Sequence, residues 1–422
     1  MRKGIPLLLS IASFFIVSSS IHGEGFFIWE QGAAAMAMGG AYVSVANNPS
    51  AVFYNPAGIA WLEGTQVSLG STWMTCLSSL QLPRWPDPRY RTTQEERQWF
   101  YPSNFFLSTV LSDKAVVGFG FFSAYGVGTK WPRDYPFRFL AVSKRMKSYF
   151  FNPTLSLKLS SNLSFGAGIS YVYSTYYLDS VRLVEDYDLP LILETSGAAW
   201  AINTGILFKT EGFSFGFIWR LSFNLRYRGE LTFHLSELPP HLQQSLPQRG
   251  SASTAVIFPH VFGLGACFRL NSRLTFTTDV HYLLWSCYER QNLSLDFPLP
   301  YADEEYEIVE DWKNSFVFRA GLEYMPGKNS ALRAGLFFSQ TPQPRETMDP
   351  LFPDADKIGF TGGFGYKKGN LVIDFAYQLE LFLERKSPNR NVYLDNETGI
   401  NNGEGIYSTI AHLFGVSIGY KF

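Results

Sequence analysis

Histidine is the residue most often used for acid–base chemistry and metal binding, and its spacing in this chain indicates no enzyme site. None of the histidines belongs to a His-Glu-x-x-His motif or stands beside a cysteine at metal-ligand spacing; they are His22, His234, His241, His260, His281 and His412. The sequence also has no glycine-rich phosphate loop. A Ser–His–Asn hydrolase site is compatible with the spacing, but no second feature supports one. We therefore expect no catalysis, no metal and no cofactor.

Arginines within otherwise apolar segments are the second group that could do chemistry. Arg319 and Arg333 lie at the polar positions of FVFRAGLEYM (316–325) and ALRAGLFF (331–338). A guanidinium can hold a carboxylate through two parallel hydrogen bonds. One interpretation makes Arg319 or Arg333 the anchor for an acidic ligand. The other places them in structural ion networks with Asp279, Glu323 and Asp374 as partners.

The segments that carry these arginines alternate apolar and polar residues with a period of two, which is typical of β-strands. About fourteen such segments are predicted: 65–77, 102–111, 115–126, 147–159, 162–177, 196–209, 213–228, 252–269, 272–289, 313–325, 330–340, 356–367, 369–384 and 406–422. Every second connection is a tight turn, and the others are long: 78–101, 127–146, 178–195, 229–251, 290–312, 341–355 and 385–405.

Short turns alternating with long loops are typical of an outer-membrane β-barrel, with the turns on the periplasmic side. A soluble sandwich gives no reason for this alternation. Aromatic and charged residues each make up 17% of the chain, and mean hydropathy is −0.03, which fits a sheet with one face in lipid and one in water. The net charge of −1 gives no support to nucleic-acid binding. We predict an all-β, transmembrane antiparallel barrel of about 14 strands, multi-pass in the bacterial outer membrane.

The two ends of the chain fit this prediction. Residues 1–23 combine Arg2-Lys3, an apolar run and small residues, which indicates a signal peptide cleaved after Gly23; the alternative, a membrane anchor, needs a longer apolar run. The last strand ends on Phe422 and resembles the assembly signal of outer-membrane barrels. We therefore expect the barrel assembly machinery and outer-membrane lipid as partners, and a monomer.

Residues 24–63 are predicted to form a hatch inside the barrel of residues 64–422. A lumen bounded by about 14 strands is too wide for its own side chains to fill, so it would leak without a plug. Gly39 and Gly40 allow positive φ or close packing, and Pro56 forces Asn55 out of the helical region. The hatch and lumen residues predicted to contact a ligand are Phe26, Phe27, Met36, Met38, Arg319 and Arg333.

The stretch GGAYVSVANNPSAVFYNPAG (39–58) resembles the N-terminal hatch of the FadL family of outer-membrane hydrocarbon transporters, with its Asn-Pro-Ala signature at Asn55, Pro56 and Ala57. Further resemblances lie at 111–132, 151–171, 311–324, 332–344 and 351–357, so they span most of the chain. In the first of these, SAYG (123–126) stands where the family has Pro-Phe-Gly.

The resemblance implies passive uptake of hydrophobic small molecules such as long-chain fatty acids. In such a transporter a ligand enters through a greasy surface groove, binds above the hatch and leaves sideways at a kink in the third strand. Loop 229–251 offers a leucine stripe for the groove, or a loop that packs on itself: Leu235, Leu238, Leu242 and Leu246. The third strand offers Gly118, Gly120 and Gly126 for a lateral gate, although such glycines could equally make room for the hatch.

Two other functions remain open at this point. A PorV-type component of protein secretion or assembly would have a similar hatch and would hold protein clients without transporting small molecules. A purely structural barrel would have no ligand pocket. A tunnel lined by Phe, Leu and Met that runs from the loops to the third strand would favour the transporter.

Overall fold

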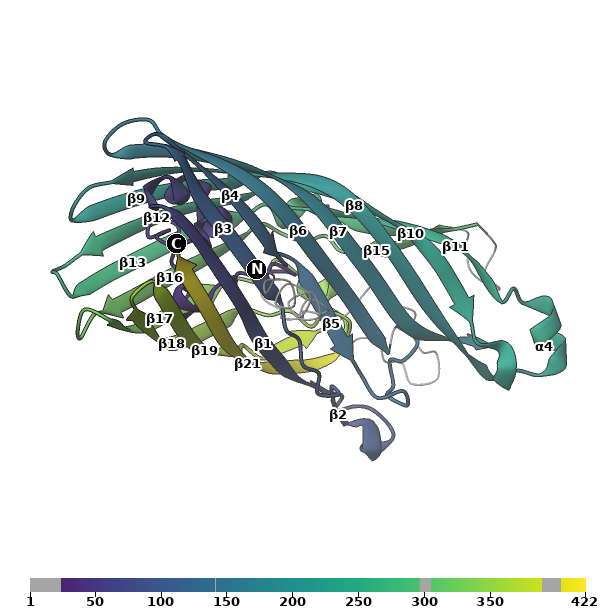
Figure 1. The fold of residues 1–422 in the computed structure, drawn as a ribbon. Helices are drawn as coiled ribbons and strands as arrows, with labels where there is room; N and C mark the ends of the chain where they lie inside the picture. The colour runs from purple at the N-terminus through teal and green to yellow at the C-terminus, as the bar shows by residue number, and fades with distance from the viewer. Residues whose placement is uncertain (1–23, 141, 297–304, 389–403) are drawn as a thin grey trace, which may run out of the picture.

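One antiparallel sheet closes on itself to form a barrel in the computed structural model, which describes residues 24–140, 142–296, 305–388 and 404–422 (Figure 1). The predicted signal peptide, residues 1–23, lies outside these ranges. Pairing of β1 with β21, from Gln66↔Lys421 to Gln81↔Ile406, closes the barrel. Its fourteen strands are formed by β1 (Thr65–Gln81), β3 (Ser103–Ser112), β4 (Ala115–Phe122) with β5 (Gly126–Lys130), β6 (Ser143–Lys158), β7 (Leu163–Val184), β8 (Tyr187–Lys209), β9 (Phe213–Arg220) with β10 (Phe223–Phe233), β11 (Arg249–Phe258) with β12 (Val261–Arg269), β13 (Leu274–Leu283) with β14 (Arg290–Leu295), β15 (Glu305–Val309) with β16 (Ser315–Tyr324), β17 (Ser330–Ser339), β18 (Lys357–Lys368), β19 (Leu371–Phe382) and β21 (Gly405–Lys421).

Short elements complete the fold. Two short strands, β2 (Thr92–Gln94) and β20 (Arg385–Ser387), pair with β1 and β21. The helical segments are α2 (Ala33–Ala37), α3 (Ala51–Tyr54), η2 (Pro56–Trp61), η3 (Pro88–Tyr90), η4 (Leu235–Glu237), α4 (Pro240–Ser245), η5 (Trp285–Cys287) and η6 (Arg345–Thr347). None of the helices among the described residues is long and apolar enough to cross a membrane.

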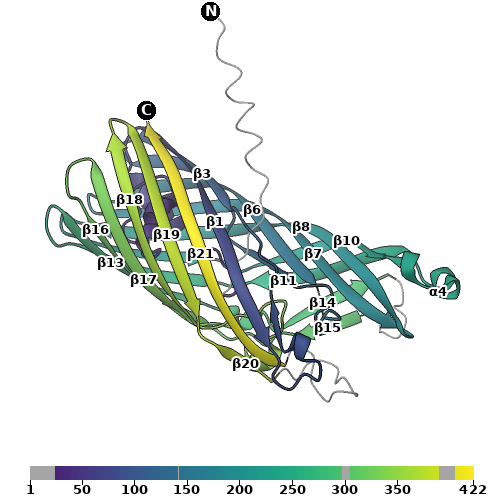
Figure 2. The ribbon, with the colours of Figure 1, turned by 90° about the horizontal axis from the view of Figure 1, so that it is seen from below.

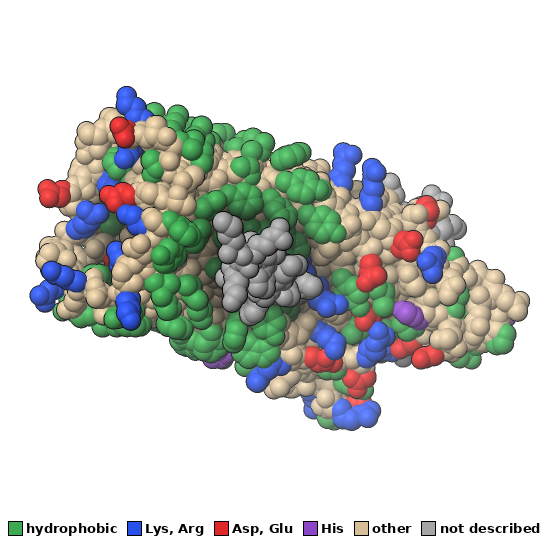
Figure 3. Space-filling model, viewed as in Figure 1, with side chains coloured by type: hydrophobic (Ala, Val, Ile, Leu, Met, Phe, Trp, Pro, Cys, Tyr) green, Lys and Arg blue, Asp and Glu red, His purple; other side chains and the backbone are tan. Residues whose placement is uncertain are grey.

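The alternating pattern separates a lipid face from a lumen face, as predicted. On β17, Leu332, Leu336 and Phe338 point outward and are 36–55% exposed, while Arg333 of the same strand is ion-paired inside. Figure 3 shows hydrophobic side chains gathered across the middle of the molecule, with charged side chains toward both ends. Exposed apolar side chains arranged in this way are stable only in hydrocarbon.

The opening segment lies within the barrel, where Figure 1 shows it surrounded by strands. Almost every residue from Glu24 to Leu62 is buried. Backbone groups of the segment hydrogen-bond to side chains on distant parts of the wall, as with Ala33 N to Ser417 Oγ (2.8 Å) and Val43 N to Asp279 Oδ2 (2.9 Å). The barrel wall therefore satisfies polar groups that this short segment cannot pair within itself.

Several connections are shorter than predicted because the strands extend beyond the lipid. The predicted loop 178–195 is wrong: β7 and β8 continue as a hairpin joined at Glu185–Asp186, where Glu185 has φ 56°. The strands β7, β8, β10 and β11 project far past the barrel on the side of α4 (Figures 1 and 2), opposite the end where β21 finishes. Leucines on their inner face, such as Leu191 and Leu231, are buried against one another, which stabilises pairing outside the membrane.

Candidate functional site

The third barrel strand is interrupted, and the chain's opening residues fill the interruption. β4 pairs with both β3 and β6, whereas β5 pairs with β6 on one side. On the other side the opening segment provides the hydrogen bonds: Ile28 N donates to Ala124 O (2.8 Å), and Gly126 N donates to Phe26 O (2.9 Å). Residues 24–28 therefore act as a short substitute strand at a gap in the wall.

The interruption lies at 123–125, within the SAYG stretch that departs from the family pattern. Its three residues include no glycine, and Tyr125 is held by Ser148, whose Oγ accepts from Tyr125 N (3.0 Å). Gly118 and Gly120 lie earlier, in regular sheet, where an added Cβ would come within 2.7 and 2.9 Å of Val52. These two glycines make room for the hatch and do not form the break. Gly126 borders it.

At the start of the hatch, the Phe26 ring sits in an aromatic cage. Its centroid lies 4.8 Å from Trp285, 5.0 Å from Trp312 and 5.6 Å from Tyr288. Phe258 and Phe352 complete the cage at 6.1 and 5.6 Å. Gly25 has φ 65° and an added Cβ would meet Trp285 at 2.6 Å, so the chain must have glycine here to reach the cage.

A continuous apolar cluster joins the cage to the wall gap. Phe27 pairs with Tyr125 across the interruption, with their ring centroids 4.9 Å apart. Tyr125 in turn lies 4.5 Å from Phe258 of the cage. Aromatic side chains therefore line the lumen from the cage to the break in the third strand.

Arg319 fixes the start of the opening segment. Its guanidinium forms an ion pair with Glu24 and donates a hydrogen bond to Gly39 O (2.9 Å). It also lies 5.1 Å from the Trp29 ring. Burial raises the pKa of the Glu24 carboxyl above its ordinary value, although the charge of Arg319 opposes this. The arginine is thus occupied by the chain's own carboxylate, two residues from the ring that fills the cage.

Glu310 holds two rings of the cage in position. One of its carboxyl oxygens accepts from Trp312 Nε1 (2.9 Å), and the other accepts from Tyr288 OH (3.3 Å). Burial raises the pKa of Glu310 from 4.5 to about 7. The charged groups Lys144 and Asp349 act on this carboxyl from neighbouring elements.

The other predicted residues lie away from this site. Arg333 bridges Glu323 and Asp374, both at 2.7 Å, which fits the structural interpretation. Met36 packs in a separate cluster with Ile28 and Met74. Met38 belongs to the same cluster as Phe26, but it packs on the wall, where an added Cβ at Gly321 would lie 2.8 Å from its Cβ.

The hatch motif behaves as its residue types predict. Asn55 has extended backbone (φ −157°, ψ 104°), and its Nδ2 donates to Val43 O (2.8 Å) and to Ile206 O (3.1 Å). Its Oδ1 caps η2 by accepting from Ala57 N (3.1 Å), with Pro56 at the first position of that helix. Gly39 and Gly40 have φ of 66° and 74°. The motif therefore ties the hatch to itself and to β8.

The leucines of loop 229–251 face inward. Leu238 and Leu242 are buried in the same cluster as the inner leucines of β8 and β10, and Leu235 and Leu246 pack against it. They form no exposed stripe, which favours the interpretation of a loop that packs on itself. A role in ligand entry stays a prediction.

Sequence reasoning missed the cage, Glu24, Glu310 and the site of the wall break. One signal was present: the alternation fails at 284–289, where Leu-Trp-Ser-Cys-Tyr-Glu interrupts a predicted strand. Among the described residues no cluster of three or more His, Cys, Asp or Glu side chains could hold a metal ion.

Comparison with models of protein families gives a match over nearly the whole chain. The model for the family described as "Outer membrane protein transport protein (OMPP1/FadL/TodX)" matches residues 14–422. A search of curated proteins gives no match.

Solved structures of similar fold include a Pseudomonas aeruginosa FadL homologue, with TM-score 0.82, 19% identity, and coverage of 94% of this chain and 100% of that one. The P. putida toluene transporter TodX gives TM-score 0.72 at 17% identity, covering 94% and 99%. The Ralstonia pickettii toluene transporter TbuX gives 0.69 at 16%, covering 93% and 98%.

Proposed function

The chain belongs to the OMPP1/FadL/TodX family of outer-membrane transport proteins, and we propose that it passively admits long-chain fatty acids or related hydrocarbons. The ligand binds in the aromatic cage at the start of the hatch and leaves sideways into the membrane through the gap between β3 and β5. No step needs a cofactor or an energy source, because the ligand moves down its own concentration gradient.

One observation supports this proposal: a single segment occupies both the aromatic cage and the gap in the wall. Phe26 fills the cage, and its carbonyl is bonded to Gly126 at the wall gap. A ligand that takes the place of Phe26 in the cage therefore also loosens the residues that close the gap. Binding and release are coupled through five consecutive residues, 24–28.

The same segment indicates the chemistry of the ligand. Glu24 presents a carboxylate to Arg319, and Phe26 presents an apolar group to the cage. An anionic amphiphile offers the same two groups. Each CH₂ transferred from water to an apolar site contributes about 0.8 kcal/mol, so an exit that leads directly into hydrocarbon spares the ligand a costly return to water.

A crosslink across the gap tests the proposal. Phe27 and Tyr125 form a bridge in which neither residue bonds directly to the other's backbone, a pairing whose Cα separation of about 4.5 Å suits a disulfide. We expect the variant F27C/Y125C to stop uptake of a radiolabelled fatty acid into liposomes when oxidised and to recover on reduction. The matched control L332C/F364C joins paired lipid-facing residues of β17 and β18 and leaves uptake unchanged in both states.

Two results would count against the transporter. Uptake by the oxidised F27C/Y125C protein at the wild-type rate would show that the ligand leaves by another route. Failure of the wild-type protein to bind or admit alkyl and aromatic probes would leave the PorV-type function, which requires no small-molecule passage, as the better account.

A further inference from the structure

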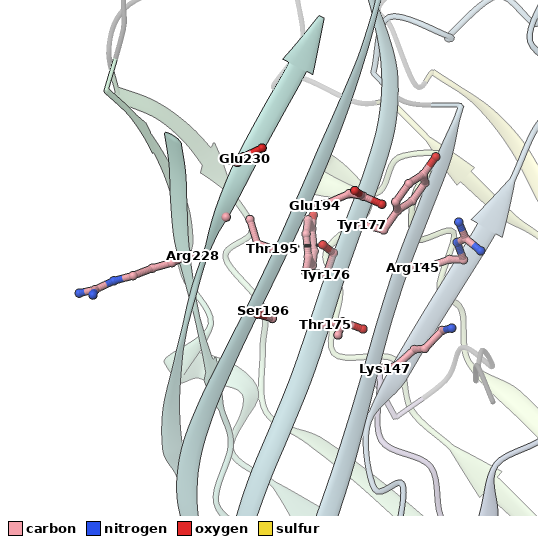
Figure 4. A pocket seen from close by; sticks show the side chains of 11 residues that line it. Arg145, Lys147, Thr175, Tyr176, Tyr177, Glu194, Thr195, Ser196, Arg228 and Glu230 are labelled. Carbon is pink, nitrogen blue, oxygen red and sulfur yellow. Dashed lines mark hydrogen bonds between the residues drawn. The ribbon is translucent and has the colours of Figure 1, made fainter. Parts of the chain in front are cut away.

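We propose that the outer surface of β6, β7, β8 and β10 holds the phosphate groups of an anionic lipid in the outer leaflet. A shallow groove of about 510 Å³ lies on these strands. Its lining includes Arg145 and Lys147 on one side, Thr175 and Ser196 on its floor, and Arg228 on the other side. Figure 4 shows Arg145 and Lys147 extending from one strand and Arg228 from the far edge of the group.

Strand register places the groove on the lipid-facing side of the wall. Lys147 lies opposite Thr175, Thr175 opposite Ser196, and Ser196 opposite Arg228, so these residues form one row across four strands. The residues that alternate with them, such as Ser148 and Ser174, are buried in the lumen. A row on this face is in contact with whatever surrounds the barrel.

The row also lies at the depth of the lipid headgroups. The next outward-facing pair along β6 and β7, toward the turns, is Tyr149 with Tyr173, followed by Phe151 with Tyr171. Trp200 lies opposite Tyr171 on β8 and is 64% exposed. Tyrosine and tryptophan gather at the boundary between hydrocarbon and headgroups, so cations one step further toward the loops reach the phosphate layer.

The cations in and beside the groove have no carboxylate partner among the described residues. Among the described residues no carboxylate lies within ion-pair distance of Arg145, Lys147, Arg226 or Arg228, whereas Glu230 faces Arg249 at 3.6 Å. That leaves four cations against the single carboxylate of Glu194.

Arg145 shows the deficit most clearly. Its guanidinium lies 4.4 Å from the centre of the Tyr177 ring, which fixes its direction, and no carboxylate among the described residues forms an ion pair with it. Phosphate oxygens are the acceptors that arginine prefers. The groove therefore offers positive charge and donors at a depth where the membrane supplies phosphate.

This arrangement belongs to one sector of the barrel. At the loop ends of β16, β17 and β18, the outward positions are Phe316, Phe338 and Ile358. The loop ends of these three strands therefore present apolar side chains outward where the groove presents cations. The groove is thus a local site, and a lipid bound to it can rest its acyl chains on Tyr149, Phe151 and Trp200, a contact that a free anion cannot make.

Native mass spectrometry of the detergent-purified protein with added lipid A tests the inference. The variant K147E/R228E reverses one charge on each side of the groove, and K367E/K368E makes the same change in net charge at an exposed turn of the opposite end. A cation near an anionic lipid surface changes affinity by about fivefold. We expect K147E/R228E to retain lipid A at least about tenfold less well than the wild type, and K367E/K368E to match the wild type.

Three outcomes would overturn the inference. Equal loss of lipid A in both variants would mean that the change in net charge alone causes the effect. Equal retention of phosphorylated and dephosphorylated lipid A by the wild type would leave only apolar contact. Displacement of the lipid by inorganic phosphate at equal concentration would indicate a site for free anions. If K147E/R228E fails to assemble, the neutral variant K147Q/R228Q gives the same comparison. Fatty-acid uptake, measured in parallel, is expected to stay unchanged, so the result is independent of the transport proposal.

Discussion

Replacing Phe26 with alanine should tighten the binding of apolar ligands, because in the proposed mechanism Phe26 occupies the cage in which the ligand binds. A buried phenylalanine side chain contributes about 2–3 kcal/mol relative to an exposed one, and here five rings surround it. A ligand that displaces Phe26 must overcome this free energy before it gains its own contacts. Removing the ring therefore raises apparent affinity by about 30- to 150-fold.

The tryptophans of the cage provide the assay. Ligand bound there contacts Trp285 and Trp312, so quenching of their fluorescence during titration with dodecanoic acid or toluene reports occupancy. The variant W285F identifies the signal that arises in the cage. Phe316→Ala serves as the matched control, because Phe316 faces lipid and is 42% exposed; its affinity should equal that of the wild type.

Unchanged or weaker ligand binding by Phe26→Ala would contradict this prediction. If Phe26 forms part of the binding surface and stays in place beside the ligand, then Phe26→Ala weakens binding. Unchanged or weaker affinity in this variant, with normal heat-modifiable migration on gels to show a folded barrel, would mean that the segment and the ligand do not share the cage.

Substitutions at Arg319, Glu310 and Asn55 test three other contacts of the hatch and the cage. Arg319→Ala should weaken binding of carboxylated ligands more than neutral ones in the same titration, whereas Arg333→Ala should affect both alike; equal effects at Arg319 would remove it as an anchor. The pKa of Glu310 is raised to about 7 in the folded protein, so its stabilising contribution is complete below about pH 4.5 and is lost as pH rises through 7. Amide exchange at 310–312, corrected for intrinsic rates, should therefore accelerate between pH 6 and 8 in the wild type. It should not accelerate in Glu310→Gln, whose side chain stays neutral. Asn55→Ala removes side-chain hydrogen bonds to Val43, Ile206 and Ala57, each worth about 1 kcal/mol. It should therefore increase leakage of small polar solutes through the barrel in liposome-swelling assays. Asn370→Ala, at an exposed position, is the control and should not change leakage.

Interactions set by strand alternation could be predicted from sequence. Arg333 and its partners Glu323 and Asp374 all occupy lumen positions: Glu323 lies opposite Arg333 on the neighbouring strand β16, and Asp374 lies on β19, one strand beyond the intervening β18. Period two was enough to predict that all three side chains face the lumen. The positive φ of Gly39 and Gly40 and the extended backbone of Asn55 were also predictable, because these depend on the residue itself or on its neighbour in the chain.

Contacts made within the closed lumen could not be predicted in this way. Phe26 is more than 250 residues from Trp285, Trp312 and Phe352, and the four rings meet only because the segments that leave the strands fold inward over the hatch. The break at 123–125 contains no glycine, although the predicted gate residue Gly126 borders it, and it is stabilised by a partner, residues 24–28, almost one hundred residues earlier. The extension of β7 and β8 past the membrane likewise depends on leucines from β10 and the 229–251 loop.

The sequence by itself determined that this chain is a lipid-facing barrel with a plug, because a two-residue period, turn lengths and small-residue punctuation are local properties. Only the tertiary structure decided what the first residues of the plug, 24–28, contact. Closing the wall brings the opening residues against one interrupted strand and one aromatic cage at the same time, and that coincidence depends on distances around the barrel that no local pattern encodes.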